Sequence, residues 1–150
     1  MKSVLRHLRT SKKLLPGKAL TQQISRNASV LLPDNDQLKE EEQMLRSTCA
    51  DFAANELAPN AWKVDKECAF PMETIKKMGD LGLMGLQIKP ELGGSGLDYM
   101  AYAIVMEEIS RGCATAGVIV SAHNSLYLGP LSNYANDQQA KEYITPFVTG

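Results

Sequence analysis

Apolar residues recur at helical spacing along much of the chain after residue 35. The first set follows steps of three and four, which place its members on one face of a helix. This set is Leu45, Cys49, Phe52, Ala53 and Leu57. It predicts a helix over residues 36–57, ended at Pro59 because proline cannot donate the next backbone hydrogen bond. The polar residues 60–69 that follow predict a crossing loop, with Trp62 as its anchor.

A second helix is predicted to start at Phe70-Pro71. Proline fits a first helical turn, where its missing N–H is not needed, and glycine at position 82 or 85 provides a C-terminal stop. Its buried face is predicted to hold Met72, Ile75 and Met78. Residues 86–90 then predict a short extended piece, followed by a turn-rich segment over residues 91–96.

Two further helices are marked by capping residues. One begins near Asp98, whose side chain can accept hydrogen bonds from free backbone N–H groups, and it runs to about residue 112. Its predicted core stripe is Tyr102, Val105, Met106 and Ile109. The other begins at Asn136 or Asp137 and reaches about Tyr143, before Pro146.

The segment 114–128 is almost entirely apolar and contains many small residues. Its triplet Val118-Ile119-Val120 favours a strand, but the length of the segment and its helical neighbours favour a helix. Ile119, Ala122 and Leu126 would then share one face, because they are three and four residues apart. Such a face belongs to a core or to a pocket for an apolar ligand, and the pattern by itself favours the core. The sequence therefore predicts an all-α bundle of about five helices.

Charge divides the chain into two parts. Residues 1–33 contain no acidic residue and seven basic ones, while the remainder has 9 basic against 17 acidic residues. The seven are Lys2, Arg6, Arg9, Lys12, Lys13, Lys18 and Arg26. A basic, acid-free start with spaced leucines is typical of a mitochondrial transit peptide, predicted here over residues 1–30. A disordered basic arm or a nucleic-acid-binding tail is the alternative.

Composition and cysteine usage narrow the possible chemistry. A hydrophobic content of 44% and a net charge of −1 predict a globular protein with no electrostatic preference for nucleic acid. No apolar run is long enough for a membrane span. Three widely spaced cysteines and two distant histidines predict neither a disulfide framework nor a metal site.

Three groups are candidate chemical sites. The Gly93-Gly94-Ser95-Gly96 segment lacks the context of a phosphate-binding loop, so a flexible turn is expected. Glu107 and Glu108 point about 100° apart on a helix, which favours ion pairing, with Arg111 as one partner, over acid–base chemistry. His123 could be a general base, but no partner for it can be inferred from its neighbours in sequence.

Several longer motifs resemble the acyl-CoA dehydrogenases, and the short-chain, butyryl-CoA type in particular. They are Phe52-Ala-Ala-Asn-Glu-Leu-Ala-Pro59, Pro90-Glu-Leu-Gly-Gly-Ser-Gly-Leu-Asp-Tyr99, Met106-Glu-Glu-Ile-Ser-Arg-Gly-Cys113 and Asn124-Ser-Leu-Tyr-Leu-Gly-Pro130. The resemblance covers residues 34–150 and implies the family's N-terminal helical domain. It also implies that the middle β-domain and the C-terminal helical domain lie beyond this sequence.

The resemblance implies an FAD-dependent α,β-dehydrogenation of short-chain fatty acyl-CoA in mitochondrial β-oxidation. It further implies electron transfer to electron-transferring flavoprotein, a homotetramer when full length, and a location in the mitochondrial matrix. The family's catalytic glutamate and flavin-binding motifs have no counterpart here, so no catalytic, FAD-binding or metal-binding residue is predicted and the chain alone is expected to be inactive. By resemblance, Ile119, Ala122 and Leu126 line the inner end of the acyl pocket. The alternatives are a non-catalytic helical module that binds acyl chains or protein partners, a truncated gene product without activity, or a part of a peroxisomal acyl-CoA oxidase.

Overall fold

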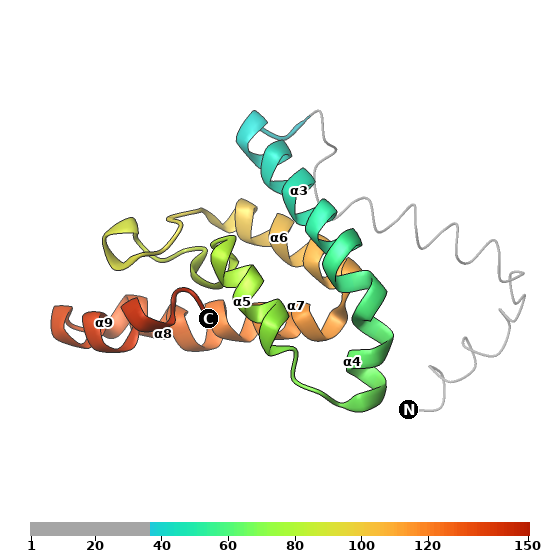
Figure 1. The fold of residues 1–150 in the computed structure, drawn as a ribbon. Coiled ribbons are helices and arrows are strands. Elements are labelled where there is room, and N and C mark those ends of the chain that lie inside the picture. The colour runs from blue at the N-terminus through green and yellow to red at the C-terminus, as the bar shows by residue number, and fades with distance from the viewer. Residues whose placement is uncertain (1–36) are drawn as a thin grey trace, which may run out of the picture. The chain divides into compact units, whose positions relative to one another are not determined.

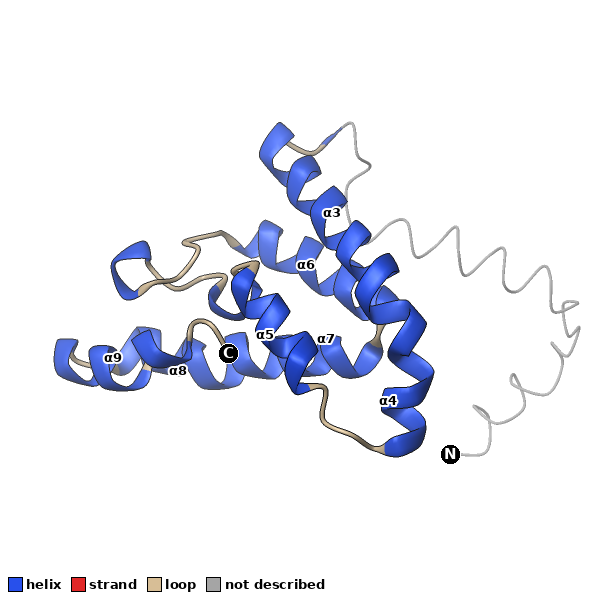
Figure 2. Cartoon of the chain, viewed as in Figure 1, coloured by secondary structure: helices blue, strands red, loops and turns tan. Residues whose placement is uncertain are grey.

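The computed structural model describes residues 37–150, and every regular element within that range is a helix (Figures 1 and 2). The α-helices are α3 (Glu40–Phe52), α4 (Ala61–Glu67), α5 (Met72–Asp80), α6 (Tyr99–Gly112), α7 (Ala114–Ser121), α8 (Gly129–Tyr134) and α9 (Asp137–Tyr143). Two π-helical segments are η2 (Ala53–Leu57) and η6 (Ala122–Leu128). Four 3-10 turns are η3 (Ala58–Asn60), η4 (Leu83–Gly85), η5 (Pro90–Leu92) and η7 (Thr145–Phe147). The predicted all-α class is confirmed.

Each of the five predicted helices is present, and local signals account for their ends. The Asp98 carboxylate accepts a hydrogen bond of 2.9 Å from the Ala101 N–H, and the Asn136 side chain accepts one of 2.9 Å from the Gln139 N–H. Gly82 follows α5 with a φ of +75°, a conformation that suits glycine because it has no Cβ. These caps confirm the predicted starts of α6 and α9 and the predicted stop of α5.

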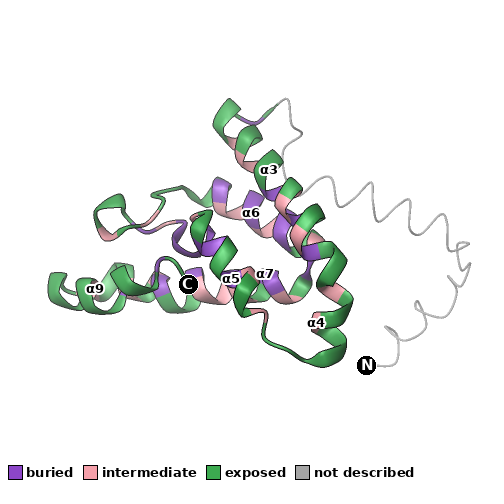
Figure 3. Ribbon diagram, in the orientation of Figure 1, coloured by how far each residue is buried: buried purple, intermediate pink, exposed green. Residues whose placement is uncertain are grey.

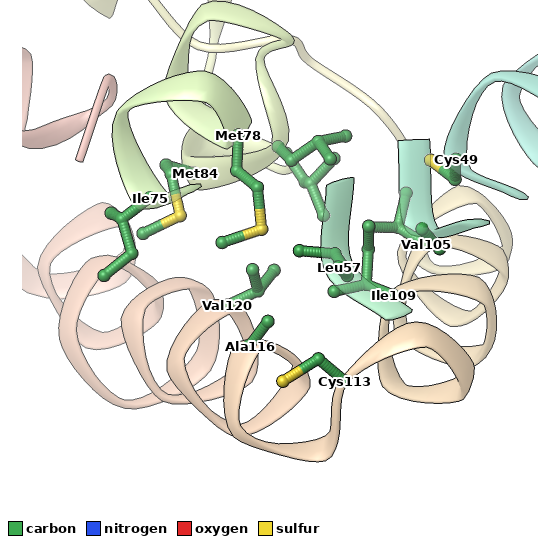
Figure 4. Packing of buried hydrophobic residues seen from close by; sticks show 13 residues of the cluster. Cys49, Leu57, Ile75, Met78, Met84, Val105, Ile109, Cys113, Ala116 and Val120 are labelled. Atoms are coloured by element: carbon green, nitrogen blue, oxygen red, sulfur yellow. The ribbon is translucent and has the colours of Figure 1, made fainter. Parts of the chain in front are cut away.

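The main core lies where α3 and η2 cross the hairpin of α6 and α7, with α5 and η4 closing the remaining side (Figures 3 and 4). Met78 and Met84 point into the space between Leu57 and Val120 (Figure 4). All four side chains are 3% exposed or less. Burying each such side chain contributes about 1.5–3 kcal/mol. Met72, predicted to share this face, is instead 55% exposed, because it lies in the first turn of α5, before the helix reaches the core.

A smaller cluster holds the last residues described. Ile88, Leu128, Ile144 and Val148 are buried together. The backbone at Thr149 also passes directly over Gly79 of α5. A Cβ placed on Gly79 would lie 1.8 Å from the Thr149 carbonyl oxygen. A glycine at this position is therefore needed for the close approach of the two backbones.

The predicted loop over residues 60–69 is wrong. The chain continues from η2 through η3 into α4, and Pro59 lies inside this continuous helical run. Trp62 does not anchor the segment in the core, since it is 65% exposed and carries the Lys66 ammonium 5.9 Å above its ring. Residues 86–90 likewise form turns and a bend up to Ile88 in place of the predicted extended piece.

Both π-helical segments lie just before a proline and along a buried stripe of period four. Leu57 ends η2 two residues before Pro59, and Leu128 ends η6 two residues before Pro130. The stripes are Cys49, Ala53 and Leu57 in the first run and Ala116, Val120, Asn124 and Leu128 in the second. In an α-helix, positions four apart drift by about 40° at each step. The wider π turn reduces this drift, so the buried residues of each run stay on one side up to the proline, and the helical run continues beyond it.

The structure bears on the prediction about membrane spans but not on the predicted transit peptide. The predicted transit peptide over residues 1–30 lies outside the described residues. Within residues 37–150, no helix combines the length and the apolar character that crossing a bilayer requires.

Candidate functional site

The helical run formed by α7, η6 and α8 has a buried side and an apolar exposed side. Val120 and Leu128 on the buried side are fully covered, whereas Val118 is 68% exposed and Leu126 is 76% exposed. Apart from His123, residues 114–128 contain no side chain that ionises near neutral pH. The α7–η6 part of the run therefore presents an uncharged surface on which Val118 and Leu126 are exposed, a composition that suits an apolar ligand.

The three residues predicted to line a pocket all lie along this run. Ile119 is partly buried and packs against the main core. Ala122 is partly buried at the first position of η6, and Leu126 is exposed within η6. Ile119 thus contributes to the core on one side and adjoins the exposed apolar surface on the other.

Asn124 is a buried polar residue on the inner side of η6, and its contacts were not predicted. Its Nδ2 donates hydrogen bonds to the carbonyls of Leu83 at 2.9 Å and Val120 at 3.0 Å. Its Oδ1 accepts one of 2.9 Å from the Leu86 N–H. The side chain thereby links η6 to η4 with both amide hydrogens used. A polar residue at the third position of a period-four buried stripe was the available signal in the sequence.

His123 has a structural contact. Its Nε2 lies 2.8 Å from the Phe147 carbonyl oxygen, and a carbonyl can only accept, so Nε2 carries a hydrogen. The ring also lies 5.6 Å from the ring of Tyr127, which meets Phe147 edge-on at 5.4 Å. The imidazole therefore fastens η7 to η6, and among residues 37–150 no acid or nucleophile contacts Nε2.

The glycine-rich turn is closed to phosphate. Gly93 and Gly96 have φ values of +90° and +63°, as expected for a turn built on glycine. All five backbone N–H groups from Gly93 to Leu97 donate to carbonyls of residues 85–90. A phosphate cradle needs such N–H groups to be free, so the segment is a turn, as expected, and does not fit the pyrophosphate of a dinucleotide.

The carboxylates of Glu107 and Glu108 belong to an ion-pair network with two arginines. Arg111 contacts Glu107 at 3.1 Å and Glu108 at 3.0 Å, and Arg46 of α3 contacts the same pair at 3.0 and 3.5 Å. The predicted ion pairing is confirmed, with Arg46 as an additional partner. Burial, with a smaller effect of the Glu108 charge, raises the pKa of the neighbouring Cys49 thiol to about 11. That thiol is therefore protonated and inert at neutral pH.

Comparison with known proteins identifies the domain. The family described as acyl-CoA dehydrogenase, N-terminal domain, matches residues 39–150. The chain belongs to this family. No group of three or more His, Cys, Asp or Glu residues in the described part of the chain could hold a metal ion.

The relatives of this acyl-CoA dehydrogenase domain are much longer than the chain. The short-chain specific acyl-CoA dehydrogenase, mitochondrial, of Rattus norvegicus is 55% identical over 114 residues, which are 76% of this chain and 28% of that enzyme. Butyryl-CoA dehydrogenase from Megasphaera elsdenii shares the fold with a TM-score of 0.70 and 26% identity, over 75% of this chain and 30% of that one. A chain in a structure of the electron transferring flavoprotein of Acidaminococcus fermentans matches with a TM-score of 0.72 and 33% identity, over 76% of this chain and 30% of that one.

Proposed function

We propose that this chain supplies the N-terminal helical domain of an FAD-dependent acyl-CoA dehydrogenase that acts on short-chain acyl-CoA. The observation that carries the proposal is the uncharged outer side of α7 and η6, where Val118 and Leu126 are exposed, backed by a buried stripe. Ile119, Ala122 and Leu126 form one wall of the acyl pocket. The 55% identity to a short-chain specific enzyme supports the choice of substrate class.

The role of the three pocket residues is to bound the acyl chain and keep water away from it. Dehydrogenation removes a proton from the α-carbon and a hydride from the β-carbon, and FAD, when bound, supplies the acceptor for the hydride. Ile119 packs against the main core, so its branched side chain limits the depth of the pocket. A branched aliphatic side chain has few rotamers, which makes this limit a firm one.

The location and partners of the protein form part of the same proposal. Residues 1–30 act as a mitochondrial leader, and the full-length protein works in the matrix, in fatty acid β-oxidation. The names of the mammalian relatives, which include the word mitochondrial, support this location. Electron-transferring flavoprotein is the proposed electron acceptor, and a homotetramer is the proposed assembly.

A chimeric enzyme tests the proposal. Residues 39–150 replace the homologous stretch of the rat short-chain enzyme, and oxidation of butyryl-CoA and octanoyl-CoA is followed with an artificial electron acceptor. We expect a flavin-containing enzyme that prefers butyryl-CoA. Ile119→Ala should raise kcat/KM for octanoyl-CoA about tenfold relative to butyryl-CoA, because removing three carbons of a bounding side chain is worth about 1–3 kcal/mol.

The matched control is Val64→Ala, which shortens a partly buried branched side chain in α4, outside the α7–η6–α8 run. It should leave the ratio of the two substrates unchanged. A chimera that binds flavin but does not oxidise butyryl-CoA would contradict the proposed substrate class. Equal effects of Ile119→Ala and Val64→Ala would contradict the proposed pocket wall.

A further inference from the structure

The change from α-helical to π-helical hydrogen bonding falls within η6. The Ala122 N–H still donates to the carbonyls of Val118 and Ile119, as in an α-helix or its tightened form. The π segment spans Ala122–Leu128, and the Gly129 N–H after it donates to the Asn124 carbonyl, five residues back. The ladder therefore changes its spacing between Ala122 and Gly129, in the part of the run that carries the predicted pocket wall.

Two side chains bond to backbone carbonyls at this change. Asn124 Nδ2 donates to the Val120 carbonyl at 3.0 Å, and Ser125 Oγ donates to the Ser121 carbonyl at 2.7 Å. Side-chain donors that reach the carbonyl four residues back compete with the backbone N–H that an α-helix would place there. Insertion of such groups is a recognised cause of local departures from α-helical geometry.

Asn124 differs from Ser125 because it is also fixed from outside its own helix. The Leu83 carbonyl and the Leu86 N–H, at the two ends of η4, take its second amide hydrogen and its carbonyl oxygen. A rotated amide would set the oxygen against two carbonyls, so only one orientation satisfies all three contacts. The side chain is 4% exposed, which removes water as a competing partner.

The helical spacing decides which side chains face outward beyond Ala122. Each residue of an α-helix turns the chain by about 100°, and a π turn takes in an additional residue before it closes. Leu128 then stays on the buried side, fully covered, and Leu126 stays on the exposed side. If the same stretch were α-helical, the following residues would rotate about the helix axis, and the wall would present different side chains.

We propose that Asn124 is a positioning residue that holds the α-to-π change and thereby sets which side chains of η6 form the acyl-facing surface. The expected effect of Asn124 on substrate choice rests on the proposed function. Its structural basis, the three hydrogen bonds of one buried amide, is independent of that function. Asn124 acts through the side chains beyond Ala122, Leu126 in particular, and does not itself contact the acyl chain.

The first test uses the full 150-residue chain and measures backbone amide exchange by NMR. Asn124→Asp keeps an acceptor for the Leu86 N–H but loses both donors. It should speed exchange in residues 124–128 about tenfold, since the local opening becomes easier. Asn133→Asp makes the same chemical change at an exposed position of α8 and is the matched control. Equal exchange in the two variants would overturn the proposal.

A milder variant covers the case in which Asn124→Asp does not fold. Asn124→Ser retains a short donor for the Val120 carbonyl but cannot reach Leu83 and Leu86. Faster exchange in residues 124–128, with exchange in α6 unchanged, is the expected result. If Asn124→Ser exchanges like the wild type, the link to η4 does not hold the π segment, and the proposal fails.

The second test places Asn124→Ser in the chimeric enzyme. A misplaced wall should lower the kcat/KM ratio of butyryl-CoA to octanoyl-CoA about tenfold, mainly through KM for butyryl-CoA. A loss of folded enzyme would lower both rates equally and leave the ratio and both KM values unchanged, and that result would overturn the positioning role. An inactive wild-type chimera would contradict the proposed function, whereas the exchange measurements would still decide the structural part.

Discussion

The two π-helical segments have the same type of backbone hydrogen bonding but are held by different contacts, an exposed ion pair for η2 and a buried amide for η6. Both follow an α-helix, both end two residues before a proline, and both carry a period-four buried stripe. Toward its neighbour α5, η2 is tied by the ion pair of Glu56 and Lys77, whose side chains are 42% and 54% exposed. Toward its neighbour η4, η6 is tied by the buried amide of Asn124.

An asparagine lies in or near each π-helical segment, and the two side chains can be compared directly. Asn60 Nδ2 donates to the Glu56 carbonyl at 3.2 Å, as Asn124 Nδ2 donates to the Val120 carbonyl at 3.0 Å. Asn60 is exposed and makes this contact within its own run, whereas Asn124 is buried and also reaches η4. The same bond is replaceable by water in the first case and irreplaceable in the second. The hydrogen-bond distances alone therefore do not show which asparagine contributes more to stability, whereas the difference in burial does.

The largest expected effect comes from removing the two amides. Asn124→Ala leaves buried partners at Leu83 and Leu86 without hydrogen bonds and should lower the free energy of unfolding by about 3 kcal/mol. Asn60→Ala, at the surface, should change it by less than about 0.5 kcal/mol. Urea unfolding of the full chain, followed by far-ultraviolet circular dichroism, measures both. Similar losses in the two variants would refute the role assigned to burial.

Substituting a glycine that lies against each π segment tests how closely that segment is packed. A Cβ on Gly112 would lie 2.8 Å from the Cβ of Ala53 and 2.9 Å from its carbonyl oxygen. Gly112→Ala should therefore separate α6 from η2 and cost about 2 kcal/mol. A Cβ on Gly129, just after η6, has the Asn124 carbonyl oxygen at 3.3 Å as its nearest neighbour. Gly129→Ala should stay within about 1 kcal/mol of the wild type in the same urea titration, and a larger loss there would reverse the predicted order.

The prolines test what causes each π segment. Pro59→Ala restores an N–H near η2 and should let residues 53–57 return to α-helical bonding. Pro130→Ala should leave η6 as it is, because Asn124 still holds it. Both stability changes should be within about 1 kcal/mol. NMR couplings through hydrogen bonds identify each acceptor, and reversion in both variants would show that proline alone maintains the π geometry.

The smallest effect is expected from the surface pair of η2. The hydrogen bond from Lys77 to Glu56, followed by the attraction of the Glu56 charge, raises the pKa of Lys77 above its ordinary value of 10.5. A raised lysine pKa stabilises the fold below pH 10.5, and this contribution is lost as pH rises through the raised value. Glu56→Gln should therefore lower the urea midpoint slightly at pH 7, and the difference should close above pH 10.5. A difference that persists in strong alkali would indicate a contribution other than this ion pair.

Local signals predicted most of the helices, but not what happens around Pro59 and Asn124. Asp98, Asn136 and Gly82 act on backbone groups a few residues away, so their roles could be inferred from the sequence. The continuation past Pro59 depends on the stripe from Cys49 to Leu57 finding a partner in α6, which lies far along the chain. Trp62 was wrongly predicted to anchor a loop for the same reason, since that loop followed from ending the helix at Pro59.

The candidate site divides in a similar way. The steps from Ile119 to Ala122 and Leu126 predicted a shared position along one helix, and the structure shows where each side chain lies. Their role as a pocket wall remains a proposal. The contacts that fix this part of the helix come from Leu83 and Leu86, about forty residues earlier, and no periodicity within η6 could reveal them. Burial of an amide between distant elements is a tertiary property.

The exposed position of Trp62 has a consequence for spectroscopy. It is the single tryptophan of the chain, and its indole lies at the solvent side of α4 beside Lys66. Its fluorescence in the native chain should resemble that of an indole in water, and unfolding should change the emission maximum little. A blue shift would instead report a protein surface that covers α4. The residue thus serves as a built-in probe of association, and dichroism remains the measure of folding.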